Sequence, residues 1–196
     1  MNPADSVPWI VAGLGNPGTR YEATWHNAGF LALEVLSQRT GIRTDRIRFQ
    51  GLSGQGTLGG NRVVLLKPST FMNRSGQSIR DALAWHKVPP ERLVVVYDDI
   101  DLPCGTLRIR PSGGPGTHNG MRSIVETLGT ESFPRVRIGI GPVPERWDLA
   151  DYVLSPIPGD RREILFQSLV RAAQAVETLV VEGLAAAMNK YNGEVP

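Results

Sequence analysis

Two short, continuously apolar runs constrain the fold of this chain more than any other feature. Ile10 to Leu14 and Leu93 to Tyr97 contain no charged residue, and glycine or acidic residues follow each of them. Strands that are apolar on both sides are typical of a sheet that helices cover on both faces, whereas a half-exposed strand would alternate apolar and polar residues. We therefore expect an α/β fold with a buried, largely parallel sheet.

Helical and strand patterns alternate along the rest of the chain. Apolar periodicity predicts helices over the ranges 28–40, 75–87, 121–128 and 159–192, the last with a break at Glu182-Gly183. Ser75 or Ser78 could cap the second of these helices. Further strands are predicted over 47–58, 62–67, 106–110 and 135–140, the first two joined as a hairpin by glycines. Alternation of this kind predicts one domain over residues 1–196, with a mixed, largely parallel, twisted sheet and helices on both faces.

Length and composition fit a globular chain of this kind. A chain of 196 residues is long enough to bury a sizeable core. Its first residues, MNPADSVP, contain neither a basic region nor a long apolar run, and no stretch of about eighteen apolar residues occurs anywhere in the sequence. We therefore expect a cytoplasmic protein that does not enter a membrane. The single Cys104 cannot form an internal disulfide, which agrees with a reducing compartment.

Charge is spread unevenly over the chain. The net charge is +2, but residues 1 to 144 carry 16 basic and 11 acidic groups, and the remainder carries 5 and 8. Two pairs of arginines, Arg108 with Arg110 and Arg135 with Arg137, each share one face of a predicted strand because side chains two residues apart point the same way. If these strands lie close together, an anionic group such as phosphate would neutralise them. The alternative is an ordinary solvated sheet face.

The glycine turn after the first strand resembles a nucleotide-binding loop only in its spacing. Gly13, Gly15 and Gly18 satisfy G-x-G-x-x-G, but that motif needs a helix that opens at the glycines and points its amides at a pyrophosphate. A polar run follows instead, and helical periodicity starts only near Ala28. We therefore exclude a dinucleotide site and expect the turn to hold Asn16 at the edge of a cleft.

His26 is the candidate general base. It lies in the segment after this turn, which we expect to be irregular and to carry Tyr21 and His26 back over the cleft. An imidazole can exchange protons near neutral pH. A lone histidine is more often structural, but Asp98, at the end of a buried strand, could orient the ring and stabilise its protonated form. We expect the nearby Asp99 and Asp101 to be turn residues that accept hydrogen bonds from local amides.

Three asparagines lie in turn or loop contexts: Asn16, Asn73 and Asn119. Each could simply be a turn residue. Together they could hold a peptide or stabilise an oxyanion, because an uncharged amide both donates and accepts hydrogen bonds. His118, beside Asn119, is expected to form hydrogen bonds within its loop.

Other chemistries have less support. The sequence has no phosphate-binding G-x-x-x-x-G-K-[ST] loop, no C-x-x-C pair and no H-E-x-x-H motif. A metal site built from His26, His118 and the aspartates is conceivable, but the local spacing does not indicate one.

Several ordered segments resemble the bacterial-type peptidyl-tRNA hydrolases. They are GLGNPGTRYEATWHNAGF, KPSTFMNRSG, DDIDLPCGTLRIR, GTHNGMRSI and RVRIGIG, between residues 13 and 141. The resemblance implies a monomeric α/β enzyme, with no metal, cofactor or obligate protein partner, that acts in translation. It would cleave the ester between a peptide and the terminal ribose of tRNA and so recycle tRNA from prematurely released peptidyl-tRNA.

The resemblance also assigns roles to particular residues. His26 matches the general base of the family and Asp98 the acid that orients it. The amides that contact substrate and water correspond to Asn16, Asn73 and Asn119, of which the resemblance places Asn16 and Asn73 with the catalytic pair. The remaining matches are two residues that line the site, Tyr21 and Phe71, and two that grip the tRNA 5′-phosphate, Arg110 and Arg137. The family often has Gly-Gly or Ala-Gly before its His-Asn pair, whereas Pro115 and Thr117 stiffen and enlarge this loop.

Two alternatives stay open at this point. One is an RNA-binding protein on the same fold that has no catalytic activity, although His26, Asp98 and Asn73 are intact. The other is a metal-dependent esterase, which would lose activity to a chelator and would not need tRNA.

Overall fold

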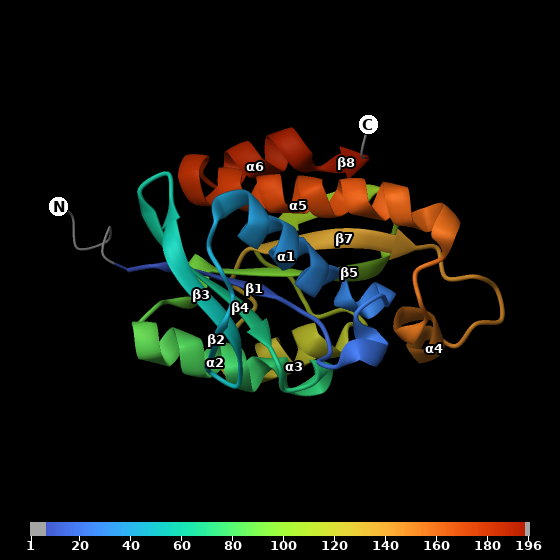
Figure 1. The fold of residues 1–196 in the computed structure, drawn as a ribbon, viewed down its shortest axis with the longest axis horizontal. Helices are drawn as coiled ribbons and strands as arrows, with labels where there is room; N and C mark the ends of the chain where they lie inside the picture. Colours follow the sequence, from blue (N-terminus) through green and yellow to red (C-terminus); the bar gives the residue numbers. More distant parts are fainter. Residues whose placement is uncertain (1–6, 195–196) are drawn as a thin grey trace.

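The computed structural model describes residues 7–194, which form one sheet with helices on both faces (Figure 1). The strand order is β2-β3-β4-β1-β5-β7-β6-β8. The four central strands are parallel: β4 (Asn61–Pro68), β1 (Trp9–Gly13), β5 (Leu93–Pro103) and β7 (Arg135–Gly141). The outer strands are antiparallel to their neighbours: β2 (Arg46–Arg48), β3 (Gly51–Leu58), β6 (Thr106–Arg110) and β8 (Gly193–Glu194). This arrangement confirms the predicted fold class, while both ends of the predicted domain lie outside the described residues.

The helices divide between the two faces of the sheet (Figure 1). One face carries α1 (Ala28–Thr40), α5 (Arg162–Glu182) and α6 (Leu184–Tyr191), and the other carries α2 (Ser75–His86) and α3 (Asn119–Leu128). Each face has its own buried apolar cluster, the first around Val96 and Leu169 and the second around Val95 and Ile79. The strands are therefore covered on both sides, as their uninterrupted apolar sequences predict.

Helix α5 is long and apolar enough to cross a membrane by length and composition alone. Core helices of soluble proteins meet the same criterion. Here Leu165, Leu169, Ala172, Val176 and Leu179 of α5 are buried in the first apolar cluster, so this helix forms part of the core.

Three local predictions were wrong. The predicted strand over 47–58 is divided by a tight turn in which Phe49 and Gln50 both have φ of 53°. Strand β5 continues through the acidic residues to Pro103, because Asp98 and Asp99 pair with β7. Neither serine expected to cap α2 does so; the Ser75 hydroxyl donates to the carbonyl of Met72 at 2.9 Å.

A close approach between α1 and the end of β1 leaves no room for a side chain at Gly29. A Cβ atom added to Gly29 would lie 2.3 Å from the Val96 carbonyl oxygen and 2.4 Å from the Leu14 amide nitrogen. The backbone of Phe30 donates to the Leu14 carbonyl at 3.0 Å. The start of α1 therefore rests directly on the end of β1, and this contact sets the position of the residues between them.

Short helices surround the ends of the central parallel strands. They are η2 (Thr19–Tyr21), η3 (Trp25–Asn27), η4 (Met72–Arg74) and α4 (Leu149–Leu154), with η5 (Pro90–Arg92) and η6 (Gly159–Arg161) elsewhere. The segment around His26, expected to be irregular, thus contains two turns of 3₁₀ helix. Because the carboxyl ends of β1, β4 and β5 meet at one edge of the sheet, the residues that follow them converge there.

Candidate active site

A cleft of about 960 Å³ opens at this edge of the sheet. Eight of the nine predicted site residues line it, and they come from seven different segments of the chain. These residues are Asn16, His26, Phe71, Asn73, Asp98, Arg110, Asn119 and Arg137. Arg135 lines it as well. The ninth residue of the set, Tyr21, does not line the cleft; it lies in η2, where its hydroxyl contacts the guanidinium of Arg20.

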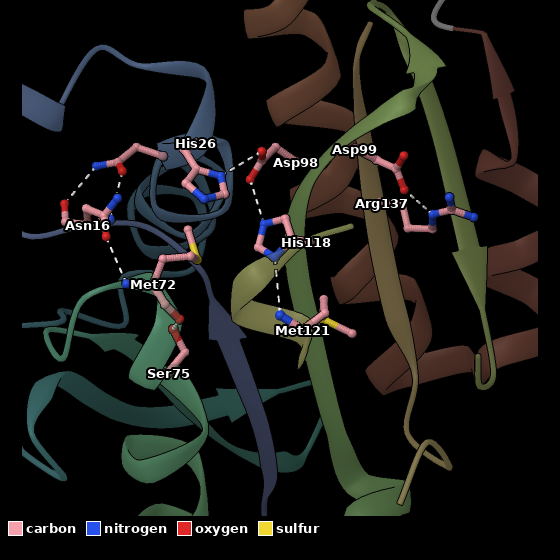
Figure 2. Close-up of polar contacts among 10 residues, drawn as sticks. Asn16, His26, Met72, Ser75, Asp98, Asp99, His118, Met121 and Arg137 are labelled. Carbon is pink, nitrogen blue, oxygen red and sulfur yellow. Dashed lines mark hydrogen bonds and ion pairs between the residues drawn. The ribbon is translucent and has the colours of Figure 1, made fainter. Parts of the chain in front are cut away.

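His26 and Asp98 form a buried pair at the base of the cleft (Figure 2). The Nδ1 atom of His26, on η3, lies 2.9 Å from a carboxylate oxygen of Asp98, on β5. A carboxylate can only accept a hydrogen bond, so this contact places the ring proton on Nδ1. The other nitrogen, Nε2, is then the one that can take a proton from water.

His118 holds the other oxygen of the same carboxylate (Figure 2). Its Nδ1 accepts a hydrogen bond from the Met121 amide at 3.2 Å and so caps α3, while its Nε2 lies 3.0 Å from Asp98. A neutral ring that accepts at Nδ1 must carry its proton on Nε2. Asp98 therefore receives one hydrogen bond from each of two histidines and is held in a single orientation.

The two members of the buried pair shift each other's pKa values. Burial alone would lower the pKa of His26, but the charge and hydrogen bond of Asp98 raise it above its ordinary value. Burial would raise the pKa of Asp98, yet His26 and His118 together hold it well below the usual range. Asp98 is consequently ionised at neutral pH and favours the protonated form of His26.

Asn16 is fixed on three sides (Figure 2). Its side-chain oxygen accepts from the Met72 amide at 2.8 Å. Its backbone is clamped by the side chain of Asn27, which accepts from the Asn16 amide at 2.8 Å and donates to the Asn16 carbonyl at 3.1 Å. Because the Asn16 oxygen faces Met72, the side-chain NH₂ is the group that can donate into the cleft.

The other polar and aromatic residues of the set lie on the walls of the cleft. Asn73, in η4, and Asn119, the first residue of α3, are both exposed. Phe71 is 54% exposed and adopts a φ of 57°, a conformation that non-glycine residues rarely adopt. That backbone geometry turns an apolar ring toward solvent at the mouth of the cleft.

The arginines form one group, as the sequence suggested they would if their strands were adjacent. In the antiparallel pair β6 and β7, Arg108 lies opposite Arg137 and Arg110 lies opposite Arg135. Arg135 is buried, and it donates to the carbonyls of Gly114 and Glu131. These four arginines form the arginine face, which begins within the cleft that also contains the His26 and Asp98 pair.

The sequence analysis did not identify all the contacts of this site. His118 was expected to bond only within its loop, and Asp99 only to local amides. Asp99 does accept from the Asp101 amide at 2.9 Å, but it also forms an ion pair with Arg137. Asn27 and Met72 had no predicted role. These contacts join residues that lie far apart in sequence, and the only local signal was that Asn27 follows His26.

His26, Asp98 and His118 bring ligand atoms within 4.8 Å of one another, a spacing that could hold a metal ion. In this structure both histidines are hydrogen-bonded to Asp98, and the second ring nitrogen of His118 accepts a hydrogen bond from the Met121 amide. A metal would have to replace both histidine protons and separate the hydrogen-bonded pairs. The donor set is thus better suited to proton transfer than to metal binding.

Known proteins match this chain over nearly its whole length. The sequence model of the family described as "Peptidyl-tRNA hydrolase" matches residues 10–196. A peptidyl-tRNA hydrolase of Alkaliphilus oremlandii is 54% identical over 184 residues, which cover 94% of this chain and 99% of that protein. The corresponding protein of Chloroflexus aggregans is 51% identical over 185 residues, or 94% of this chain and 98% of that one.

Solved structures agree with the sequence matches. A crystal structure of peptidyl-tRNA hydrolase from Acinetobacter baumannii is 36% identical, with a TM-score of 0.88 over 95% of this chain and 97% of that one. A peptidyl-tRNA hydrolase in complex with N-propanol is likewise 36% identical, with a TM-score of 0.90 over 97% of both chains. The chain therefore belongs to the peptidyl-tRNA hydrolase family.

Proposed function

We propose that this chain hydrolyses the ester between a peptide and the terminal ribose of tRNA, with His26 as general base. The observation that carries the proposal is the buried pair of His26 and Asp98, at 2.9 Å, on the floor of a cleft that also reaches a face of arginines. Family membership supports the substrate class, and the geometry supports the roles of the individual residues.

The proposed reaction begins with neutral His26. Its Nε2 removes a proton from a water molecule, and the resulting hydroxide attacks the ester carbonyl. Asp98 stabilises the imidazolium that forms, because its carboxylate is already fixed against Nδ1. The ring then returns the proton to the ribose oxygen as that group leaves.

Asn16 provides a reason for the enzyme to require a peptide. Its side-chain oxygen is occupied by Met72, so the group it offers to the substrate is a donor. A donor can bond a peptide carbonyl or an oxyanion, but it repels the ammonium of a free aminoacyl group. We assign the exposed amides of Asn73 and Asn119 to the substrate and the attacking water, and the ring of Phe71 to the apolar wall of the site.

We place the tRNA on the arginine face. Arg110 and Arg137 line the cleft on β6 and β7, where guanidinium groups can grip the tRNA 5′-phosphate through paired hydrogen bonds. Tyr21 lies outside the cleft, so in this proposal it contacts only substrate that extends beyond it.

The proposed setting is the cytoplasm, where tRNA is charged and used. We expect the chain to act as a monomer, without a cofactor, membrane or obligate protein partner. The relatives that support this setting are bacterial proteins of nearly the same length.

Cleavage of two matched substrates tests the proposal. N-acetylated aminoacyl-tRNA should be hydrolysed, and the same aminoacyl-tRNA with a free amino group should be spared, with EDTA present or absent. Tight binding of tRNA without cleavage would instead favour an RNA-binding protein, and loss of cleavage in EDTA would favour a metal-dependent esterase.

A further inference from the structure

The arginine face concentrates positive charge that no acidic residue of β6 or β7 neutralises. Four guanidinium groups stand on one side of β6 and β7 in two directly opposed pairs, Arg108 with Arg137 and Arg110 with Arg135. Like charges opposite each other in a sheet are destabilising. Across residues 7–194, the ion pair of Arg137 with Asp99 is the one salt bridge in which any of the four takes part.

Asp99 is held firmly enough to act as a fixed partner. It lies on β5 next to Asp98, but successive strand residues point to opposite sides, so Asp98 serves His26 while Asp99 turns toward Arg137 (Figure 2). One carboxylate oxygen accepts from the Asp101 amide at 2.9 Å, and the other contacts Nε of Arg137. The Asp99 side chain is 7% exposed, and the Arg137 side chain is 26% exposed.

The atom that Asp99 contacts determines what Arg137 can offer. The guanidinium group is planar, so a carboxylate fixed at Nε also fixes the direction of the two terminal nitrogens. Those nitrogens stay available to the cleft, which Arg137 lines together with Arg110. Arg137 is therefore presented as an oriented pair of donors whose charge is partly offset.

We propose that Asp99 is a positioning and specificity residue that makes the arginine face select a terminal phosphate over the phosphodiesters of the RNA backbone. The inference rests on the proposed function. A terminal phosphate carries a charge of about −1.5 to −2 at neutral pH, whereas each phosphodiester carries a single charge. Four uncompensated arginines would attract any stretch of RNA backbone. One buried carboxylate weakens the attraction for both kinds of phosphate, so the selection depends on the oriented donors of Arg137, whose charge-assisted hydrogen bonds are stronger to the more highly charged terminal group.

The test compares N-acetylated aminoacyl-tRNA carrying a 5′-monophosphate with the same substrate after dephosphorylation to a 5′-hydroxyl. The parent should prefer the phosphorylated substrate in kcat/KM by about tenfold or more, as expected for charge-assisted hydrogen bonds. Asp99→Asn should reduce this preference at least about threefold, because Arg137 loses its orientation, while kcat/KM for the 5′-hydroxyl substrate holds or rises. Circular dichroism should confirm that the variant is folded.

Two further variants separate positioning from a general change of charge. Asp101→Asn removes a nearby charge that also raises the pKa of Arg137, but the exposed Asp101 side chain forms no ion pair with Arg137, so this variant should keep the parent preference. In an Arg137→Gln background, Asp99→Asn should cause no further loss, because Asp99 acts through Arg137. An equal loss in Asp101→Asn, or an equal loss for both substrates in Asp99→Asn, would overturn the inference.

Binding of deacylated tRNA, which carries no ester to cleave, tests the role of Asp99 separately from the proposed hydrolysis. Dissociation constants for 5′-phosphorylated and 5′-hydroxyl tRNA should show the same ratio in the parent and the same collapse in Asp99→Asn. A parent that cleaves no ester but shows this ratio would contradict the proposed function and support the role of Asp99. A parent that cleaves both substrates equally and binds both tRNAs equally would overturn the role of Asp99 and support hydrolysis.

Discussion

The Asp98 carboxylate lies 2.9 Å from Nδ1 of His26 and leaves Nε2 as the basic nitrogen of the ring. Both residues are buried, and each comes from a different element, η3 for the histidine and β5 for the aspartate. Because the aspartate is also held by His118, the ring cannot turn without breaking a contact that fixes both side chains. The pair is thus set in one orientation before any substrate arrives.

The pH dependence of the reaction follows from the pKa of His26. Burial lowers this pKa, but Asp98 raises it above the ordinary 6.5, so protonated His26 persists to higher pH than a free histidine would. We expect kcat/KM to rise with pH to a plateau, with a midpoint above 6.5. In Asp98→Asn the burial stays and the charge is lost, so the midpoint should fall below 6.5 and the plateau should drop by about 10²–10⁴. Identical pH profiles for the two proteins would contradict this role.

Selection against free aminoacyl-tRNA should depend on the donor group of Asn16. In Asn16→Asp the new side chain can still accept from Met72, but it offers the cleft a carboxylate oxygen in place of an NH₂ group. The ratio of kcat/KM for N-acetylated over free aminoacyl-tRNA should fall by about tenfold or more, because a carboxylate attracts ammonium. Asn73→Asp makes the same change on an exposed wall residue and should affect the ratio less. Equal ratios in the parent and Asn16→Asp would disprove the assignment.

The arginine face should account for part of the salt dependence of tRNA binding. Each phosphate contact contributes a slope of about −0.9 in log K against log salt for a duplex, so Arg110→Gln should reduce the slope by about one and raise KM. Arg43→Gln is the control, since that side chain is 83% exposed and does not line the cleft. If both variants gave the parent slope, Arg110 would not contact a phosphate.

The contact between α1 and the end of β1 should be costly to disturb. Gly29→Ala places a methyl group 2.3 Å from the Val96 carbonyl oxygen, so backbone atoms must move. We expect the free energy of unfolding to fall by about 1–3 kcal/mol in urea titrations, as for other overpacked sites. Gly159→Ala meets no atom within 4 Å and should change stability by less than about 0.5 kcal/mol. Similar midpoints for the two variants would show that the contact can relax.

Much of the fold could be predicted from local sequence, because local signals determine those parts. Helix α1 has the predicted limits, since its apolar periodicity ends at Gly41, which adopts the left-handed conformation. Helix α4 was not predicted, because it has only six residues and depends on the Asp148 side chain, which accepts from the Ala150 amide at 2.8 Å. A helix this short has little periodicity to detect.

The candidate site was only partly predictable for a different reason. Residues such as His26 and Asp98 were found because their chemistry is distinctive and their segments resemble a known family. The true end of β5 was missed because acidic residues normally end a strand, and here they are satisfied by histidine and arginine side chains from elsewhere in the chain. The orientation of Asn16 depends on Met72, 56 residues away, and no local pattern reports such a contact.

The most direct measurement is the steady-state hydrolysis of N-acetylated aminoacyl-tRNA by His26→Ala. Loss of the general base should lower kcat by about 10²–10⁴ and leave the dissociation constant for tRNA essentially unchanged. His86→Ala, at a histidine that does not line the cleft, should keep the parent kcat. A His26→Ala protein that retained the parent kcat, or that lost activity only through weaker binding, would contradict the assignment of His26 as the base.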